Sequence, residues 1–153
     1  MELVPGLTLN ERFYVEVVRP IVDAEFPGLS HAAALIGYGS DVLGYHTARS
    51  TDHEWGPRVL LFLNDGDYAA LKVRIAETLR RKLPYAFLGY PTHFTAPDAE
   101  ATRRMAAISS GLVNHKIEIY TVSGFFSWWL GFDPSGEVAR TDWLTTGRGG
   151  ARA

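Results

Sequence analysis

The sequence predicts one α/β domain in which a short mixed β-sheet is flanked by helices. Residues 31–37 and 58–63 are short apolar runs with the length of buried strands, and residues 113–120 alternate apolar with polar side chains, as a half-buried strand does. Residues 10–26 and 67–82 instead repeat apolar side chains at helical spacing. A chain of 153 residues suits a single core. We expect the domain to span residues 1–146.

The first predicted helix covers residues 10–26. Asn10 is a good N-cap residue, and three apolar residues four positions apart form one stripe: Phe13, Val17 and Ile21. Pro20 lies within this stripe and removes a backbone donor. The helix therefore either kinks there or is two shorter helices that meet.

Two strands and a second helix follow. Residues 31–37 are predicted to be a buried strand that ends near Gly37, and residues 58–63 a strand covered on both faces. Residues 64–66 form a turn, after which residues 67–82 form an amphipathic helix with a basic C-terminal end. Pro84 closes this helix.

The next segments are less regular. Residues 85–94 are expected to form an edge strand, because Pro91 cannot donate to a central ladder. Residues 95–111, with their small and polar residues, are expected to be a mobile insertion with one helical turn. In the strand at 113–120, alternate residues face one way (Val113, His115, Ile117 and Ile119) and the others face the opposite way (Asn114, Lys116, Glu118 and Tyr120).

The last predicted element is an aromatic helix, FFSWWLGF, capped by Ser123. Packing of its rings on the sheet is favoured over a partner-binding surface, and the same preference applies to Trp55 and Trp143. Residues 147–153, GRGGARA, contain no large apolar side chain and are expected to be a disordered tail.

Composition excludes several function classes. The net charge of −2 and isoelectric point near 6.2 disfavour extended nucleic-acid binding. No apolar run is long enough for a membrane span, and the N-terminal residues lack the features of a signal peptide, so we expect a cytoplasmic protein without a membrane partner. Because cysteine is absent, any metal must be bound by carboxylates or histidines.

The candidate site residues of the sequence lie mostly between the first predicted strand and the strand at 58–63. Gly39 and Ser40 follow the first strand, where a glycine-serine turn lets backbone N–H groups approach a phosphate closely. Asp52 and Glu54 precede the next strand, and their two-residue offset places both carboxylates on one face if the segment is extended. Each feature alone is more often an ordinary turn or a solvated strand edge.

Glu118, on the polar face of the later strand, is the candidate third carboxylate. Three carboxylates within about 5 Å repel by roughly 3 kcal/mol per pair at an effective dielectric near 20, so their clustering requires cations. Hard oxygen ligands of this kind suit Mg²⁺. Arg58 and Lys116 are candidate phosphate contacts, although a solvated cation at the end of a strand explains each equally well.

The segment GSDVLGYHTARSTDHE resembles the nucleotidyltransferase superfamily fingerprint, a Gly-Ser pair followed after a spacer by Asp-x-Glu. More narrowly, DHEWGPR and its flanking strands resemble a bacterial nucleotidyltransferase-like family of unknown function, number 4037, with a DHDWGPR-like signature. The resemblance extends from Glu2 to about Thr145. Its members continue into a helical C-terminal region, whereas this sequence stops after DWLTT and a glycine-arginine tail.

The resemblance implies a nucleotidyltransferase-like core and a role for each matched residue. Gly39 and Ser40 would hold the phosphates of a nucleoside triphosphate such as ATP. Asp52, Glu54 and Glu118 would be the catalytic carboxylates and bind two Mg²⁺ ions. The implied reaction transfers a nucleoside monophosphate to an unidentified hydroxyl acceptor, a small molecule or a protein, and releases pyrophosphate.

Three alternatives stay open. The short C-terminus suggests a noncatalytic remnant that binds a nucleotide or a protein partner, and an antitoxin-like nucleotidyltransferase that modifies a protein would be similarly small. A zinc hydrolase would need ligands among the five histidines, but none of them shows HExxH spacing. Those histidines are His31, His46, His53, His93 and His115.

Overall fold

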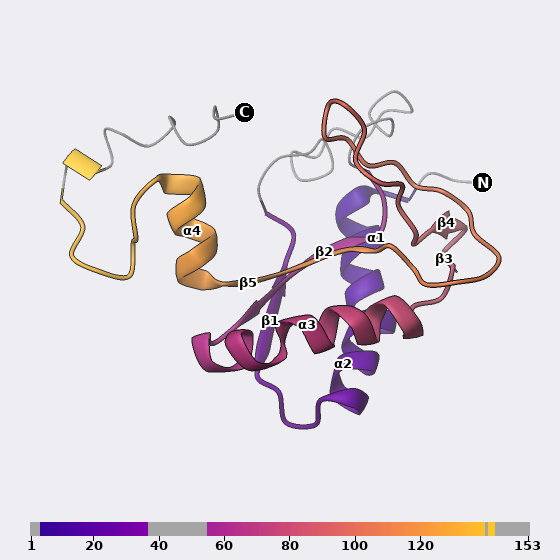
Figure 1. The fold of residues 1–153 in the computed structure, drawn as a ribbon, viewed down its shortest axis with the longest axis horizontal. Coiled ribbons are helices and arrows are strands. Elements are labelled where there is room, and N and C mark those ends of the chain that lie inside the picture. Colours follow the sequence, from indigo (N-terminus) through magenta and orange to yellow (C-terminus); the bar gives the residue numbers. More distant parts are fainter. Residues whose placement is uncertain (1–3, 37–54, 140, 143–153) are drawn as a thin grey trace.

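The structure is a computed structural model that describes residues 4–36, 55–139 and 141–142. It is a mixed α/β fold built on a small sheet with helices beside it (Figure 1). The strands β1 (His31–Ala34), β2 (Arg58–Leu63) and β5 (Lys116–Thr121) lie in the order β1-β2-β5. β1 is antiparallel to β2 and β5 is parallel to it, which confirms the predicted short mixed sheet.

One face of β2 and β5 carries the main core. The strand residues on this face pack against three helices, α1 (Gly6–Phe13), α2 (Arg19–Glu25) and α3 (Asp65–Lys82), and alternate with residues of the opposite face. These strand residues are Val59, Leu61, Leu63, Ile117 and Ile119. The bounds of β2 and the alternation within β5 are as predicted.

β1 differs from its prediction because it is an edge strand. It ends at Ala34 and its residues are half-buried or exposed, whereas the apolar pattern predicts a buried strand to Gly37. A short run of alanines satisfies the hydrophobic pattern of a covered strand, but among the described residues β1 pairs only with β2, and it is partly open to solvent. Gly37 lies outside the described residues.

The first helical stretch begins earlier than predicted. It consists of α1 (Gly6–Phe13), a π-helical segment (Tyr14–Val18) and α2 (Arg19–Glu25). The prediction that Asn10 is the N-cap is wrong, since Asn10 lies inside α1. Pro20 lies just after the π-helical segment, whose wider turn is a common adjustment where the regular hydrogen-bond ladder is interrupted.

α3 (Asp65–Lys82) is the longest described helix and begins within the predicted turn. Asn64 is its N-cap, because its side chain accepts a 2.8 Å hydrogen bond from the N–H of Asp67. Asp65 and Gly66 are therefore helical. The predicted C-terminal end at Lys82 is confirmed.

The region after α3 differs more from its prediction. Instead of one edge strand, β3 (Ala86–Phe87) and β4 (Tyr90–Pro91) form a separate hairpin whose turn contains two residues of positive φ, Leu88 and Gly89. Residues 95–111 contain no helical turn. Their chain folds back on itself, and the N–H of Thr95 donates to the carbonyl of Arg104 at 2.8 Å.

α4 (Val122–Leu130) directly follows β5, and its N-cap is Thr121, which accepts a 3.0 Å hydrogen bond from the N–H of Gly124. The predicted cap, Ser123, instead donates to Asp133. Only Phe125 of the aromatic helix is buried, so packing on the sheet is confirmed for that ring and not for the whole helix.

Trp55 is buried against Tyr90, with ring centroids 4.8 Å apart, as its core assignment predicts. Trp143 and the tail at 147–153 lie outside the described residues, so the domain boundary at residue 146 stays a prediction. Among the helices described, none combines the length and apolar character that crossing a bilayer requires.

Candidate functional site

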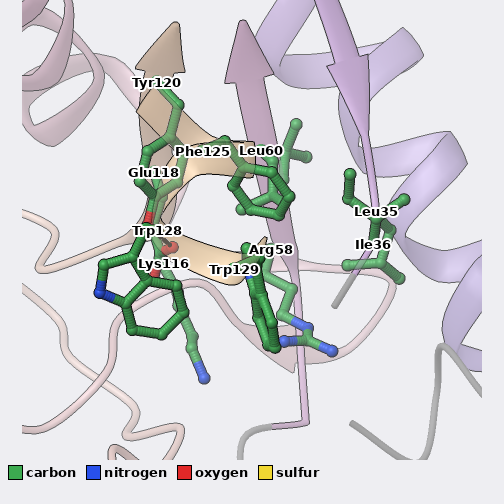
Figure 2. Close-up of a pocket in the computed structure, with 11 residues that line it drawn as sticks. Leu35, Ile36, Arg58, Leu60, Lys116, Glu118, Tyr120, Phe125, Trp128 and Trp129 are labelled. Atoms are coloured by element: carbon green, nitrogen blue, oxygen red, sulfur yellow. Dashed lines mark hydrogen bonds between the residues drawn. The ribbon is translucent and has the colours of Figure 1, made fainter. Parts of the chain in front are cut away.

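A pocket of about 240 Å³ lies over the sheet face opposite the main core (Figure 2). Its floor is made mainly by the strand residues that alternate with the core residues of β2 and β5, and Val59 of the core face also contributes to the lining. Side chains from α4 and from the residues just after β1 complete its walls. The lining residues are Leu35, Ile36, Arg58, Val59, Leu60, Lys116, Glu118, Tyr120, Phe125, Trp128 and Trp129.

Two cationic side chains, those of Arg58 and Lys116, lie on neighbouring strands at one end of this pocket. Arg58 and Lys116 are the first residues of β2 and β5, and they are direct partners in the parallel register. Both are buried, with 9% and 5% of their surfaces exposed. Figure 2 shows their side chains extending beyond the starts of the strands. Guanidinium and ammonium groups are side chains that proteins commonly use to bind phosphate oxygens.

Arg58 is held in place through its backbone. Its N–H donates a 2.6 Å hydrogen bond to Oδ1 of Asn10, and Nδ2 of Asn10 donates to the carbonyl of Gly6 at 2.8 Å. Asn10 is only 3% exposed, so this bridge lies in the interior. It fixes the start of β2, and with it the origin of the Arg58 side chain, relative to α1.

Glu118 lies two residues after Lys116 on the same face of β5 and opposite Leu60. The hydroxyl of Tyr120 donates to Oε2 of Glu118 at 2.7 Å, which orients the carboxylate within the pocket. The charge of Glu118 also acts on Arg103, in the loop that precedes β5. Burial lowers the pKa of the Arg103 guanidinium, and the negative charge of Glu118 opposes that shift.

The remaining wall is aromatic. Phe125 anchors α4 to the sheet by edge-to-face contacts with Phe62 and Tyr120, at centroid distances of 5.4 and 5.3 Å. Trp128 and Trp129 extend from the helix over the sheet toward the end of the pocket where Arg58 and Lys116 lie (Figure 2). Trp128 is 60% exposed.

The structure brings together three of the residues singled out from the sequence, Arg58, Lys116 and Glu118. The other four lie outside the described residues, so their predicted roles stay predictions; they are Gly39, Ser40, Asp52 and Glu54. Because Arg58 and Lys116 are buried in a pocket, the alternative of solvated cations at strand ends does not describe their surroundings.

Sequence reasoning missed the part played by Trp128, Trp129 and Tyr120. A usable signal existed for the tryptophans: successive helical residues point about 100° apart, so Trp128 and Trp129 cannot both face the sheet squarely. The position of Tyr120, two residues after Glu118 on one strand face, was the corresponding signal for its hydrogen bond.

The described histidines make hydrogen bonds within the protein. His31 contacts the hydroxyl of Tyr14, His93 accepts from the N–H of Asn114, and His115 contacts the carbonyl of Ala76. His46 and His53 lie outside the described residues. Within the described part of the chain, no three histidine or acidic side chains gather into a group able to bind a metal ion.

Comparison of this chain with protein-family models, with curated proteins and with solved structures gives no match. The residues of the sequence and the geometry of the pocket are therefore the basis for assigning a function.

Proposed function

We propose that this protein is a Mg²⁺-dependent nucleotidyltransferase, which transfers a nucleoside monophosphate from a nucleoside triphosphate to a hydroxyl acceptor and releases pyrophosphate. One observation carries the proposal: two buried cations and a carboxylate, Arg58, Lys116 and Glu118, share one pocket on paired strands of a mixed sheet. The sequence alone indicates Glu118 as the third carboxylate, and in the fold it lies beside the two candidate phosphate contacts.

The chain connectivity supports this assignment. Ile36 and Arg58 both line the pocket, and the segment between them in sequence carries the four other proposed site residues. Glu54 is four residues before Arg58, and Gly39 is three residues after Ile36. Both ends of the fingerprint segment are thus connected by short stretches of chain to residues that line the pocket.

The donor chemistry fits magnesium. Glu118 provides a hard carboxylate oxygen in the pocket, and Asp52 and Glu54 are the proposed additional ligands. When bound, Mg²⁺ neutralises the triphosphate and lowers the pKa of a coordinated acceptor hydroxyl.

Four side chains of the pocket have separate roles in this reaction. Arg58 and Lys116 bind phosphate oxygens and hold the triphosphate beside the carboxylates. Their burial reduces competition from water, which strengthens each charge interaction. The hydrogen bond from Tyr120 holds the Glu118 carboxylate in position, and Glu118 is the group that assists removal of the acceptor proton.

The test is pyrophosphate release from each nucleoside triphosphate in the presence of Mg²⁺, with mixed small-molecule hydroxyl acceptors and, separately, a whole-cell protein extract. We expect release with at least one triphosphate. Asp52→Asn and Glu118→Gln should each reduce the rate by about 100-fold or more. Glu100→Gln, which changes an exposed carboxylate outside the pocket, is the matched control and should keep the wild-type rate.

The same assay separates the alternatives. Label transferred to a protein in the extract identifies a protein-modifying enzyme of the antitoxin-like type. Saturable triphosphate binding without pyrophosphate release under every condition overturns the proposal in favour of a noncatalytic binding protein. Absence of both binding and release contradicts a nucleotide site altogether.

A further inference from the structure

The most exposed large aromatic side chain among the described residues belongs to the pocket. Trp128 is 60% exposed, although tryptophan side chains are on average highly buried and the same helix does bury Phe125. Exposed aromatic surface next to a charged pocket is a common mark of a ligand-binding surface. The proposed phosphate contacts do not account for it.

Trp128 contacts the neighbouring tryptophan of α4. Its ring meets that of Trp129 at a centroid distance of 5.0 Å and an interplanar angle of 87°, and Trp129 in turn contacts Phe125 at 6.0 Å. α4 follows β5 without an intervening loop, so the helix is connected directly to the strand that carries Lys116 and Glu118. The indole of Trp128 therefore contacts Trp129 and lines the pocket on the side of α4.

The charges of the pocket restrict what can lie on this ring. The described lining contains two cations, Arg58 and Lys116, and one carboxylate, Glu118. The two cations suit the anionic phosphates of a ligand, and Glu118 is the carboxylate that the proposed function assigns to Mg²⁺. A ligand that satisfies both features has an anionic group for the cations and a flat aromatic group for the indole, as a nucleotide does.

We infer that Trp128 is a stacking surface for the base of the bound nucleotide, with the phosphates directed toward Arg58 and Lys116. The inference rests on the proposed function and adds the recognition of the base, which α4 would provide within this chain. Because every base has a π-face, stacking on one indole tolerates different bases. We therefore expect purine and pyrimidine triphosphates to bind with similar affinities. Both should bind much more tightly than a polyphosphate that has no base.

The test compares ATP with inorganic tripolyphosphate, which carries the charges but no base, by isothermal titration calorimetry with Mg²⁺. Wild-type protein should bind ATP at least fivefold more tightly than tripolyphosphate. Trp128→Ala should weaken ATP binding by at least fivefold and leave tripolyphosphate binding unchanged. Trp128→Phe, which keeps a ring, should retain most of the difference.

The matched control is Val122→Ala, which trims another exposed apolar residue of α4 that does not line the pocket. It should bind both ligands like the wild type, and circular dichroism should show the same helix content in all variants. Equal binding of ATP and tripolyphosphate, or an unchanged ATP affinity in Trp128→Ala, overturns the stacking role while the phosphate site stands. If wild-type protein binds neither ligand, the proposed function itself fails, and the inference fails with it.

Discussion

Replacing Asn10 by alanine removes the interior bridge between α1 and the start of β2. The N–H of Arg58 loses its 2.6 Å partner in a place where Asn10 is only 3% exposed, and leaving such a donor unsatisfied costs about 1–3 kcal/mol. Loss of the bond to the carbonyl of Gly6 costs about 1 kcal/mol more, and the better helix propensity of alanine returns up to about 0.7 kcal/mol. We expect a net loss of about 1.3–3.3 kcal/mol.

Urea unfolding followed by tryptophan fluorescence measures this loss as a shift of the midpoint at constant slope. The matched control is Asn64→Ala, which removes the exposed N-cap of α3 and should cost only about 1 kcal/mol, because water can replace the lost partner. A loss for Asn10→Ala that is no larger than the loss for Asn64→Ala would refute the argument that this buried bridge holds β2 in place.

Two further predictions concern the surroundings of the site. Gly56→Ala should lower the melting temperature, because φ is +134° there and an added Cβ would lie 2.7 Å from Sδ of Met105; Gly136→Ala, in open space, is the control, and equal melting temperatures would contradict the strain. Burial lowers the pKa of His115 from its ordinary 6.5, with the charges of Arg103 and Arg80 acting in the same direction and the bond to Ala76 against it. The unfolded chain then binds the extra proton, so this contribution to stability is complete above about pH 6.5 and lost as the pH falls below it. Urea midpoints at pH 7.5 and 5.5 should show a smaller fall in His115→Gln than in the wild type, and an equal fall would contradict the assignment.

Three features could be predicted from the sequence because each depends on a local pattern. They are the central strand β2, the C-terminal end of α3 and the two faces of β5. Apolar continuity identified residues 58–63, and strict alternation placed Lys116 and Glu118 on the face opposite Ile117. Those two patterns already put three of the proposed site residues on neighbouring strands once β2 and β5 are paired.

The pairing of strands and the role of Asn10 could not be predicted in the same way, because they depend on partners far away in the chain. Asn10 has the side chain of an N-cap, yet its partner is the backbone of Arg58, 48 residues later. Within residues 4–36 and 55–139, the alanines of β1 pair only with β2, and no residue of the segment itself predicts this position at the edge of the sheet. The exposure of Trp128 likewise depends on how α4 leaves β5, a direction that the aromatic composition of the segment does not determine.

The central claim is that Asp52 and Glu118 act on the same ion beside a bound triphosphate. A double-mutant cycle on Mn²⁺ binding, measured by electron paramagnetic resonance with a nonhydrolysable ATP analogue, tests this claim most directly, with Asp52→Asn, Glu118→Gln and the combined variant. We predict that each single substitution weakens Mn²⁺ binding and that their effects are not additive, as expected for two ligands of one ion. Additive effects, or unchanged Mn²⁺ affinity in Glu118→Gln, would contradict it.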